Sequence, residues 1–169
     1  IPYTRYRCYQ YEKTPRLPYY PFLRIETMAK HHIEVSALVE KSYDVAKKAQ
    51  SHTHSPYSNF PVGACIKFIG DDQLYGGCNV ENASYGATIC AERTALVSAV
   101  AAKGKQNIEF LTVIANTKGA TYPCALCLQV LAEFCDKDFP VYIANAEGIL
   151  KQMSFRDFLP HSFDSLYDI

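Results

Sequence analysis

Polar and apolar positions follow two rhythms in the first half of the chain. Over residues 32–52 apolar side chains recur at helical spacing between lysines and glutamates, which predicts an amphipathic helix. The Pro-bounded stretch at 55–61 ends that helix and predicts a loop. Alternation over residues 62–69 then predicts a half-buried strand, and residues 73–80 predict its hairpin partner across Gly70-Asp71-Asp72.

The second half alternates helical patterns with short apolar runs. Helices are predicted over residues 90–103, closed by Gly104, and over residues 124–135. Strands are predicted at 108–116, 140–145 and 149–153, and Ser154-Phe155-Arg156-Asp157 has the form of a capping box that opens a short final helix. Strands that alternate with helices imply parallel pairing, with helices on both faces of one sheet in an α/β domain.

Residues 1–27 differ from the rest of the chain. They hold six of the thirteen tyrosines and four of the nine prolines, with five basic residues against two acidic ones. The prolines break helices, and no strand alternation is sustained. A transit peptide would share the arginines, but serines and an amphipathic period are missing. We expect residues 1–27 to be an extension outside the fold and residues 28–169 to form the folded catalytic domain.

Composition narrows the class of protein. A chain of 169 residues, 49% hydrophobic and 20% charged, is typical of one globular domain, and no apolar run approaches the length of a membrane span. Formal charge is balanced, which favours a small ligand over nucleic acid. Seven irregularly spaced cysteines argue against a disulfide framework and favour metal binding in a reducing cytoplasm.

Three of those cysteines accompany a glutamate. Cys90-Ala91-Glu92 is followed by Pro123-Cys124-Ala125-Leu126-Cys127. Three thiolates hold Zn²⁺ and leave its fourth position open for water, as catalytic zinc sites do. A carboxylate beside an activated water shuttles protons, so Glu92 is the predicted catalytic residue. This order of residues is typical of zinc nucleobase deaminases. The alternative, that the cysteines are packed core residues, fits Cys65, Cys78 and Cys135 better.

The predicted zinc site carries excess negative charge. Cys124 and Cys127 share one helix face, and both cysteine groups lie at helix starts, where the dipole favours thiolates. Three thiolates exceed the charge of the ion by one. We expect Arg93 to supply compensating positive charge, although this position also suits an ordinary surface arginine.

Residues that face a substrate are less distinctive. Asn79 and Glu81 end a strand just before the predicted catalytic helix, and an amide with a carboxylate suits sugar hydroxyls. Turn chemistry is the simpler explanation of Asn79. Phe60 has the position and the ring to stack on a base, although an isolated aromatic is more often a core residue.

Four ordered motifs resemble the cytidine deaminases, the small zinc enzymes with three cysteine ligands. They are Ser55-Pro56-Tyr57-Ser58-Asn59-Phe60-Pro61-Val62-Gly63-Ala64, Gly77-Cys78-Asn79-Val80-Glu81-Asn82-Ala83-Ser84-Tyr85, Thr88-Ile89-Cys90-Ala91-Glu92-Arg93-Thr94-Ala95, and residues 123–134. The resemblance covers residues 33–163. It implies a three-layer αβα sandwich around a mixed five-stranded sheet, found as a homotetramer. It also implies hydrolytic deamination of cytidine and deoxycytidine to uridine and deoxyuridine in pyrimidine salvage, with release of ammonia.

The resemblance also assigns roles. Cys90, Cys124 and Cys127 match the zinc ligands and Glu92 the proton shuttle, which protonates N3 and then the departing amino group. Arg93 matches an arginine that hydrogen-bonds the cysteine ligands. The residues that match substrate contacts are Asn79 and Glu81 for the ribose 3′-hydroxyl, Phe60 for stacking, Ala91 for its backbone contact to the pyrimidine, Tyr85, and Phe163, donated to a neighbouring subunit's site.

Two positions depart from the family pattern Cys-Gly-x-Cys-Arg-Gln. Ala125 stands in place of glycine and adds a methyl group, and Leu128 stands in place of arginine and removes a positive charge. Neither is a predicted ligand, so we expect activity with an altered rate or pH optimum. Two alternatives remain open: a deaminase for another aminated substrate, and a zinc-stabilised interaction protein without turnover. The retained Glu92 argues against the second.

Overall fold

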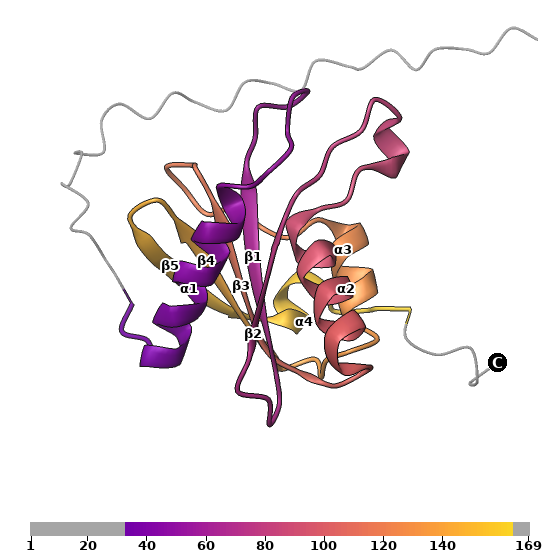
Figure 1. Ribbon diagram of the computed structural model, residues 1–169. Coiled ribbons are helices and arrows are strands. Elements are labelled where there is room, and N and C mark those ends of the chain that lie inside the picture. The colour runs from indigo at the N-terminus through magenta and orange to yellow at the C-terminus, as the bar shows by residue number, and fades with distance from the viewer. Residues whose placement is uncertain (1–32, 164–169) are drawn as a thin grey trace, which may run out of the picture. The chain divides into compact units, whose positions relative to one another are not determined.

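The computed structural model describes residues 33–163, which form a five-stranded sheet with helices on both faces (Figure 1). The predicted extension at residues 1–27 lies outside the described residues. The strands are β1 (Val62–Phe68), β2 (Leu74–Cys78), β3 (Ile108–Ala115), β4 (Pro140–Asn145) and β5 (Gly148–Ser154), in the order β2-β1-β3-β4-β5. No helix in the described part of the chain is long and apolar enough to span a membrane.

The sheet is mixed, as the family resemblance implied. β1 runs antiparallel to both β2 and β3, β3 and β4 are parallel, and β5 returns antiparallel to β4. Strands joined through helices, namely β2, β3 and β4, therefore all point the same way, as the alternation of strands and helices predicted. Only β3 and β4 are parallel neighbours, fewer than predicted. The reason is that β1, which forms a hairpin with β2, pairs antiparallel with β3 on its other side.

Alternating strand residues build two cores. On β1 and β3, Ala64, Ile66, Leu111 and Val113 belong to a core shared with α2 (Ala91–Lys103) and α3 (Ala125–Leu131). The intervening residues of these strands pack on the opposite face against α1 (Ala37–Gln50), where Ser42 and Thr112 share a buried hydrogen bond of 2.6 Å. Figure 1 shows α1 on one face and α2 with α3 on the other. This is the predicted three-layer αβα sandwich.

The helix ends differ from the predicted ones where long-range contacts intervene. α1 begins after Ser36, whose hydroxyl caps the Val39 amide, several residues later than predicted. α3 stops at Leu131 instead of reaching residue 135, because the chain turns back and the Phe134 carbonyl accepts the Ile108 amide at 2.7 Å. The last helix, α4 (Phe155–Phe158), is short and follows the predicted capping box, with the Ser154 amide donating to Asp157 at 3.0 Å.

The directions of the strands bring the predicted site residues to one end of the sheet. The carboxyl ends of β2 and β3 and the start of β1 meet at one edge of the sheet, because β1 is antiparallel to both neighbours. Asn79 follows β2, and Phe60 precedes β1. The helices α2 and α3 begin at the same edge, each directly after a predicted cysteine ligand. Every segment that carries a predicted ligand or catalytic residue therefore enters or leaves the sheet here.

Candidate active site

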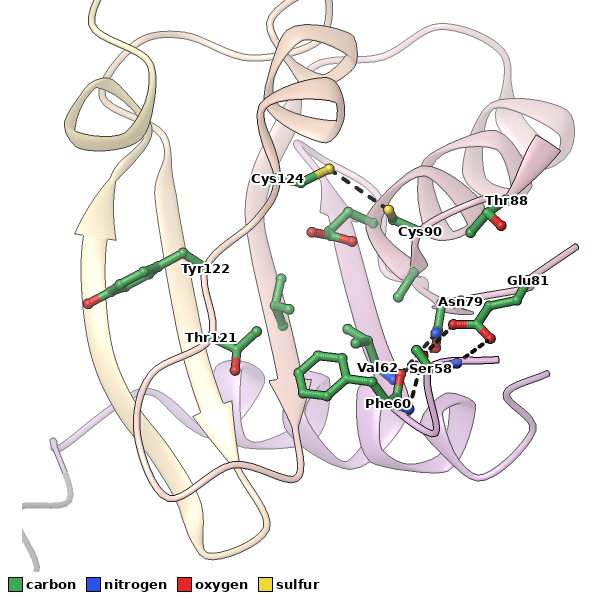
Figure 2. Close-up of a pocket in the computed structure, with 13 residues that line it drawn as sticks. Ser58, Phe60, Val62, Asn79, Glu81, Thr88, Cys90, Thr121, Tyr122 and Cys124 are labelled. Carbon is green, nitrogen blue, oxygen red and sulfur yellow. Dashed lines mark hydrogen bonds between the residues drawn. The ribbon is translucent and has the colours of Figure 1, made fainter. Parts of the chain in front are cut away.

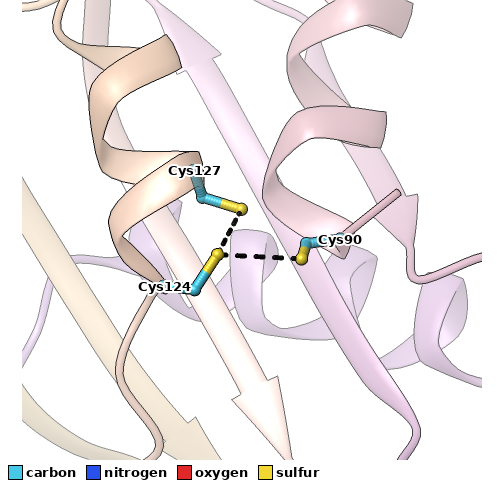
Figure 3. A group of neighbouring side chains, drawn as sticks. All are labelled: Cys90, Cys124 and Cys127. Carbon is cyan, nitrogen blue, oxygen red and sulfur yellow. Dashed lines mark hydrogen bonds between the residues drawn. The ribbon is translucent and has the colours of Figure 1, made fainter. Parts of the chain in front are cut away.

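Cys90 and Cys124 occupy equivalent places in the two helices. Each is the N-cap residue, Cys90 of α2 with φ −74° and ψ 158°, and Cys124 of α3 with φ −75° and ψ 158°. Cys127 lies one turn into α3 and is buried. The two helix starts therefore direct three sulfurs toward one point, as Figure 3 shows.

The sulfurs are spaced as zinc ligands require. Cys124 Sγ lies 3.8 Å from Cys90 Sγ and 3.4 Å from Cys127 Sγ, and all three lie within 4.8 Å of one another. Tetrahedral zinc with Zn–S bonds of about 2.3 Å separates its sulfur ligands by about 3.8 Å. Spacing and donor chemistry both fit Zn²⁺. In residues 33–163 no other group of His, Cys, Asp and Glu side chains has the arrangement of a metal site.

The thiol of Cys90 has a lowered pKa and ionises more readily than a free cysteine. Hydrogen bonding with Cys127 and with the Arg93 guanidinium lowers the pKa of Cys90 to about 5, whereas the hydrogen bond with Cys90 and burial raise the pKa of Cys127. Arg93 Nη2 lies 3.9 Å from Cys90 Sγ and also donates to the Thr88 carbonyl at 3.0 Å. Because zinc binds thiolates, binding at neutral pH releases the remaining thiol protons.

Glu92 lies two residues after Cys90 in the first turn of α2, and both residues line the pocket described below. Its side chain is buried, with 4% of the residue exposed. Burial raises the pKa of the Glu92 carboxyl to about 7. A carboxyl group with a pKa near neutrality exchanges protons readily in both directions, which is the property that a general acid–base needs.

A pocket of about 350 Å³ opens beside the cysteines. Cys90, Cys124 and Glu92 line it together with Phe60, Asn79 and Glu81, and Val62 and Val113 add apolar surface. Figure 2 shows the labelled cysteines across the pocket from the Phe60 loop. Its volume is in the range of small-molecule sites.

The Asn79 amide holds the Phe60 loop in place. Its Oδ1 accepts the Val62 amide at 2.8 Å and the Thr53 hydroxyl, and its Nδ2 donates to the Phe60 carbonyl at 3.0 Å. The turn role considered for Asn79 is therefore real, since this side chain ties loop residues to the end of β2. The second N–H of Nδ2 makes no hydrogen bond to residues 33–163.

The Glu81 carboxylate is fixed by the same loop. Its Oε2 accepts the amides of Tyr57 at 2.9 Å and Ser58 at 3.1 Å, and its Oε1 accepts the Ser58 hydroxyl. These hydrogen bonds, the Ser58 hydroxyl first, hold the pKa of Glu81 below its usual value. Glu81 is therefore an ionised acceptor at the rim of the pocket.

The other predicted substrate residues divide into two groups. Phe60, 39% exposed, and Ala91 both line the pocket. Tyr85 lines a separate depression next to it, where its ring meets that of Tyr57 at 6.0 Å. Phe163 is 63% exposed and does not line the pocket, and its backbone is held by the side-chain amide of Gln129, with the Phe163 amide donating at 3.2 Å.

Six further residues line the pocket without having been predicted as site residues from the sequence, and Val62, Thr88 and Val113 are three of them. Thr121 and Tyr122 precede the Pro-Cys motif, and their nearness to Cys124 was the available signal. The Tyr122 ring turns outward and packs against Phe158 at 5.6 Å. Ser58 lines the pocket as well, and its contacts become apparent only in three dimensions.

The two departures from the family pattern are both accommodated. Ala125 is exposed in the first turn of α3, so its methyl group meets no crowding within the described chain. Leu128 is 4% exposed and belongs to the core beneath α3. The site therefore keeps Arg93 as the cation that contacts a cysteine ligand.

A mixed sheet between helices, three converging thiols at two helix starts and a buried glutamate beside them define a zinc-dependent hydrolase of the deaminase class. Residues 36–143 match the family described as the cytidine and deoxycytidylate deaminase zinc-binding region. The chain belongs to this family.

Individual relatives agree with that assignment. A cytidine deaminase from Sporosarcina psychrophila is 43% identical over 125 residues, covering 74% of this chain and 90% of the relative. One from Halalkalibacterium halodurans is 41% identical, covering 70% and 88%. The crystal structure of cytidine deaminase from Burkholderia pseudomallei superposes with a TM-score of 0.68 at 40% identity, covering 73% of this chain and 97% of that one.

Proposed function

We propose that this protein hydrolyses cytidine and deoxycytidine to uridine and deoxyuridine with release of ammonia. The observation that carries the proposal is one pocket lined by Glu92, by Cys90 and Cys124 of the three-cysteine cluster, and by Asn79 and Glu81, a pair suited to a sugar. Cys90, Cys124 and Cys127 hold the metal, and zinc supplies the acidity that makes a water molecule nucleophilic at neutral pH.

Glu92 acts as the general base and general acid of the reaction. It takes one proton from the attacking water and delivers it to N3 while the C4–O bond forms. It then moves the second proton from the new hydroxyl to the amino group, the C4–N bond breaks, and ammonia leaves. A buried carboxyl in the same pocket as Cys90 and Cys124 suits both transfers, because it lies where the attacking water and the substrate would meet.

Sugar recognition follows from the unused hydrogen-bonding positions. Asn79 has one N–H to give, and Glu81, with three of about four acceptor positions filled, has one left on Oε1. A hydroxyl group accepts from one and donates to the other. We assign this pair to the ribose 3′-hydroxyl, present in both nucleosides, and we assign base stacking to Phe60 and a backbone contact with the pyrimidine to Ala91.

The assembly and setting of the enzyme belong to the proposal as well. We place it as a homotetramer in the cytoplasm, acting in pyrimidine salvage, with Phe163 contributed to a neighbouring active site and Tyr85 binding substrate. The exposure of Phe163 and its position outside the pocket of its own chain support its contribution to a neighbouring site. The six unpaired cysteines of residues 33–163 suit a reducing compartment.

Ammonia release tests the proposed function. The purified, zinc-replete protein should release ammonia from cytidine, and Glu92→Gln should lower turnover about a thousandfold with one zinc still bound per chain. Glu133→Gln, which alters an exposed carboxylate after α3, serves as the control and should leave turnover unchanged. Equal turnover by Glu92→Gln and wild type would contradict the mechanism. Zinc binding without ammonia release would favour a different aminated substrate.

A further inference from the structure

Ser58 connects two residues of the proposed substrate site. It lies in the loop between α1 and β1 and lines the pocket. Its oxygen accepts the Phe60 amide at 3.1 Å, and its hydroxyl donates to Glu81 Oε1 (Figure 2). The serine therefore bridges the backbone of the stacking residue and the carboxylate assigned to the sugar.

The direction of these two bonds is fixed. Because the Phe60 amide donates, Ser58 Oγ accepts from that side and its proton is directed to Glu81. The two amides of Tyr57 and Ser58 hold only Oε2 of that carboxylate. The Ser58 hydroxyl is thus the group that fixes Oε1, the oxygen that keeps an open acceptor position.

The turn itself does not depend on this hydroxyl. Asn59 adopts the left-handed conformation with φ 52°, and its amide donates to the Ser55 carbonyl at 3.0 Å. The Asn79 side chain also holds the loop from the other side, through Val62 and the Phe60 carbonyl. Backbone bonds and Asn79 remain when the Ser58 hydroxyl is removed, so its role is to orient Glu81.

We propose that Ser58 is a positioning residue that aims Glu81 Oε1 at the substrate 3′-hydroxyl and so sets the preference for sugars that carry it. This inference rests on the proposed function and deepens it. Its signature is selective: loss of the serine hydroxyl weakens use of a 3′-hydroxyl substrate and leaves a substrate without that group unaffected.

The test compares Ser58→Ala with wild type on cytidine and on 3′-deoxycytidine, both measured on the same zinc-loaded preparations. For cytidine kcat/KM should fall about tenfold, mainly through KM, because a hydrogen bond to a charged group no longer orients the acceptor. For 3′-deoxycytidine it should change less than about twofold. The ratio of the two values is independent of the folded fraction, so partial unfolding does not imitate the result.

Two further variants sharpen the comparison. Ser58→Thr keeps a hydroxyl and should restore most of the preference for cytidine. Ser55→Ala removes a hydroxyl that makes no hydrogen bond to the described residues of the same domain and should leave both substrates unchanged. An equal fall on both substrates, or no fall on cytidine, would overturn the role of Ser58 alone. Absence of ammonia release by wild type would overturn the proposed function and this role with it.

Discussion

At the scale of single residues, we expect Arg93 to compensate the negative charge of the proposed zinc site. Its guanidinium contacts Cys90 Sγ and the Thr88 carbonyl, and position 128 on α3 holds a buried leucine where the family pattern has a second arginine. The three thiolates therefore rely on one contacting cation and the two helix dipoles. Removing that cation leaves a negative cluster with less compensation.

Arg93→Gln should therefore weaken zinc binding by about ten- to a hundredfold, as loss of a residue that supports metal ligands usually does. Competition with a chromogenic chelator measures the affinity. Arg156→Gln is the matched control, because Arg156 pairs with Asp138 at 2.6 Å and both side chains are largely exposed. Unchanged zinc affinity in Arg93→Gln would show that the helix dipoles suffice.

For single residues, the sequence predicts which side chains bind the metal better than it predicts which side chains contact one another. The spacing of Cys90, Glu92, Cys124 and Cys127 identified a zinc site because metal coordination demands those side chains in that order. The contact between Ser58 and Glu81 was not predictable, because 23 positions separate them and serine is common in loops. Only the fold brings that hydroxyl to that carboxylate.

At the scale of elements, Gly77 determines how closely β2 approaches α2. A Cβ at this position would lie 2.2 Å from the Ala95 nitrogen and 2.6 Å from the Ala91 carbonyl oxygen. Both atoms belong to the backbone of the helix that carries Glu92, so they have no flexible side chain to move aside. The strand and the catalytic helix require glycine at their contact.

Gly77→Ala should lower the free energy of unfolding by about 3 kcal/mol through overpacking, measured by urea denaturation. Gly119→Ala, in the loop before α3 where no atom lies within 4 Å of the new Cβ, should change it by less than about 0.5 kcal/mol. Equal stability of the two variants would mean that α2 shifts freely, contrary to its packing against the sheet.

Element type was predictable where the pattern is local. The strand at residues 140–145 and the Gly104 cap of α2, with φ 76°, match the structure. The end of α3 was missed, because the bond between the Phe134 carbonyl and the Ile108 amide leaves no trace in helical periodicity. The pairing of β1 with β3 was also missed, because the pattern within each strand does not show which strand lies beside it.

At the scale of the whole molecule, Phe163 offers a test of shared active sites. Its ring is exposed and lies outside the pocket of its own chain, while its backbone is held by the side chain of Gln129 on α3. If a neighbouring subunit receives it, Phe163→Ala should lower kcat/KM for cytidine about tenfold through lost stacking.

Mixed oligomers distinguish a Phe163 that serves a neighbouring subunit's site from one that serves only its own chain. Co-expressed Phe163→Ala and Glu92→Gln chains should recover activity above that of either alone, because hybrid sites combine an intact Glu92 with an intact Phe163. Co-expressed Cys90→Ala and Glu92→Gln chains provide the control and should recover nothing, since both defects fall within one chain's own site. No recovery in the first mixture would show that Phe163 serves no neighbouring site.

The position of β1 between β2 and β3 has a consequence for the order of folding. The β1–β2 hairpin closes through a short turn, whereas pairing of β1 with β3 must wait until β2 and α2 have been accommodated in the intervening chain. Closing that longer loop costs more entropy, so we expect the hairpin to form first and the central pair later. Cys124 and Cys127 share one helix, but Cys90 meets them only once β3 is in place. A full-length chain that refolds should thus hold a two-sulfur half-site before Cys90 joins it and completes the proposed metal centre.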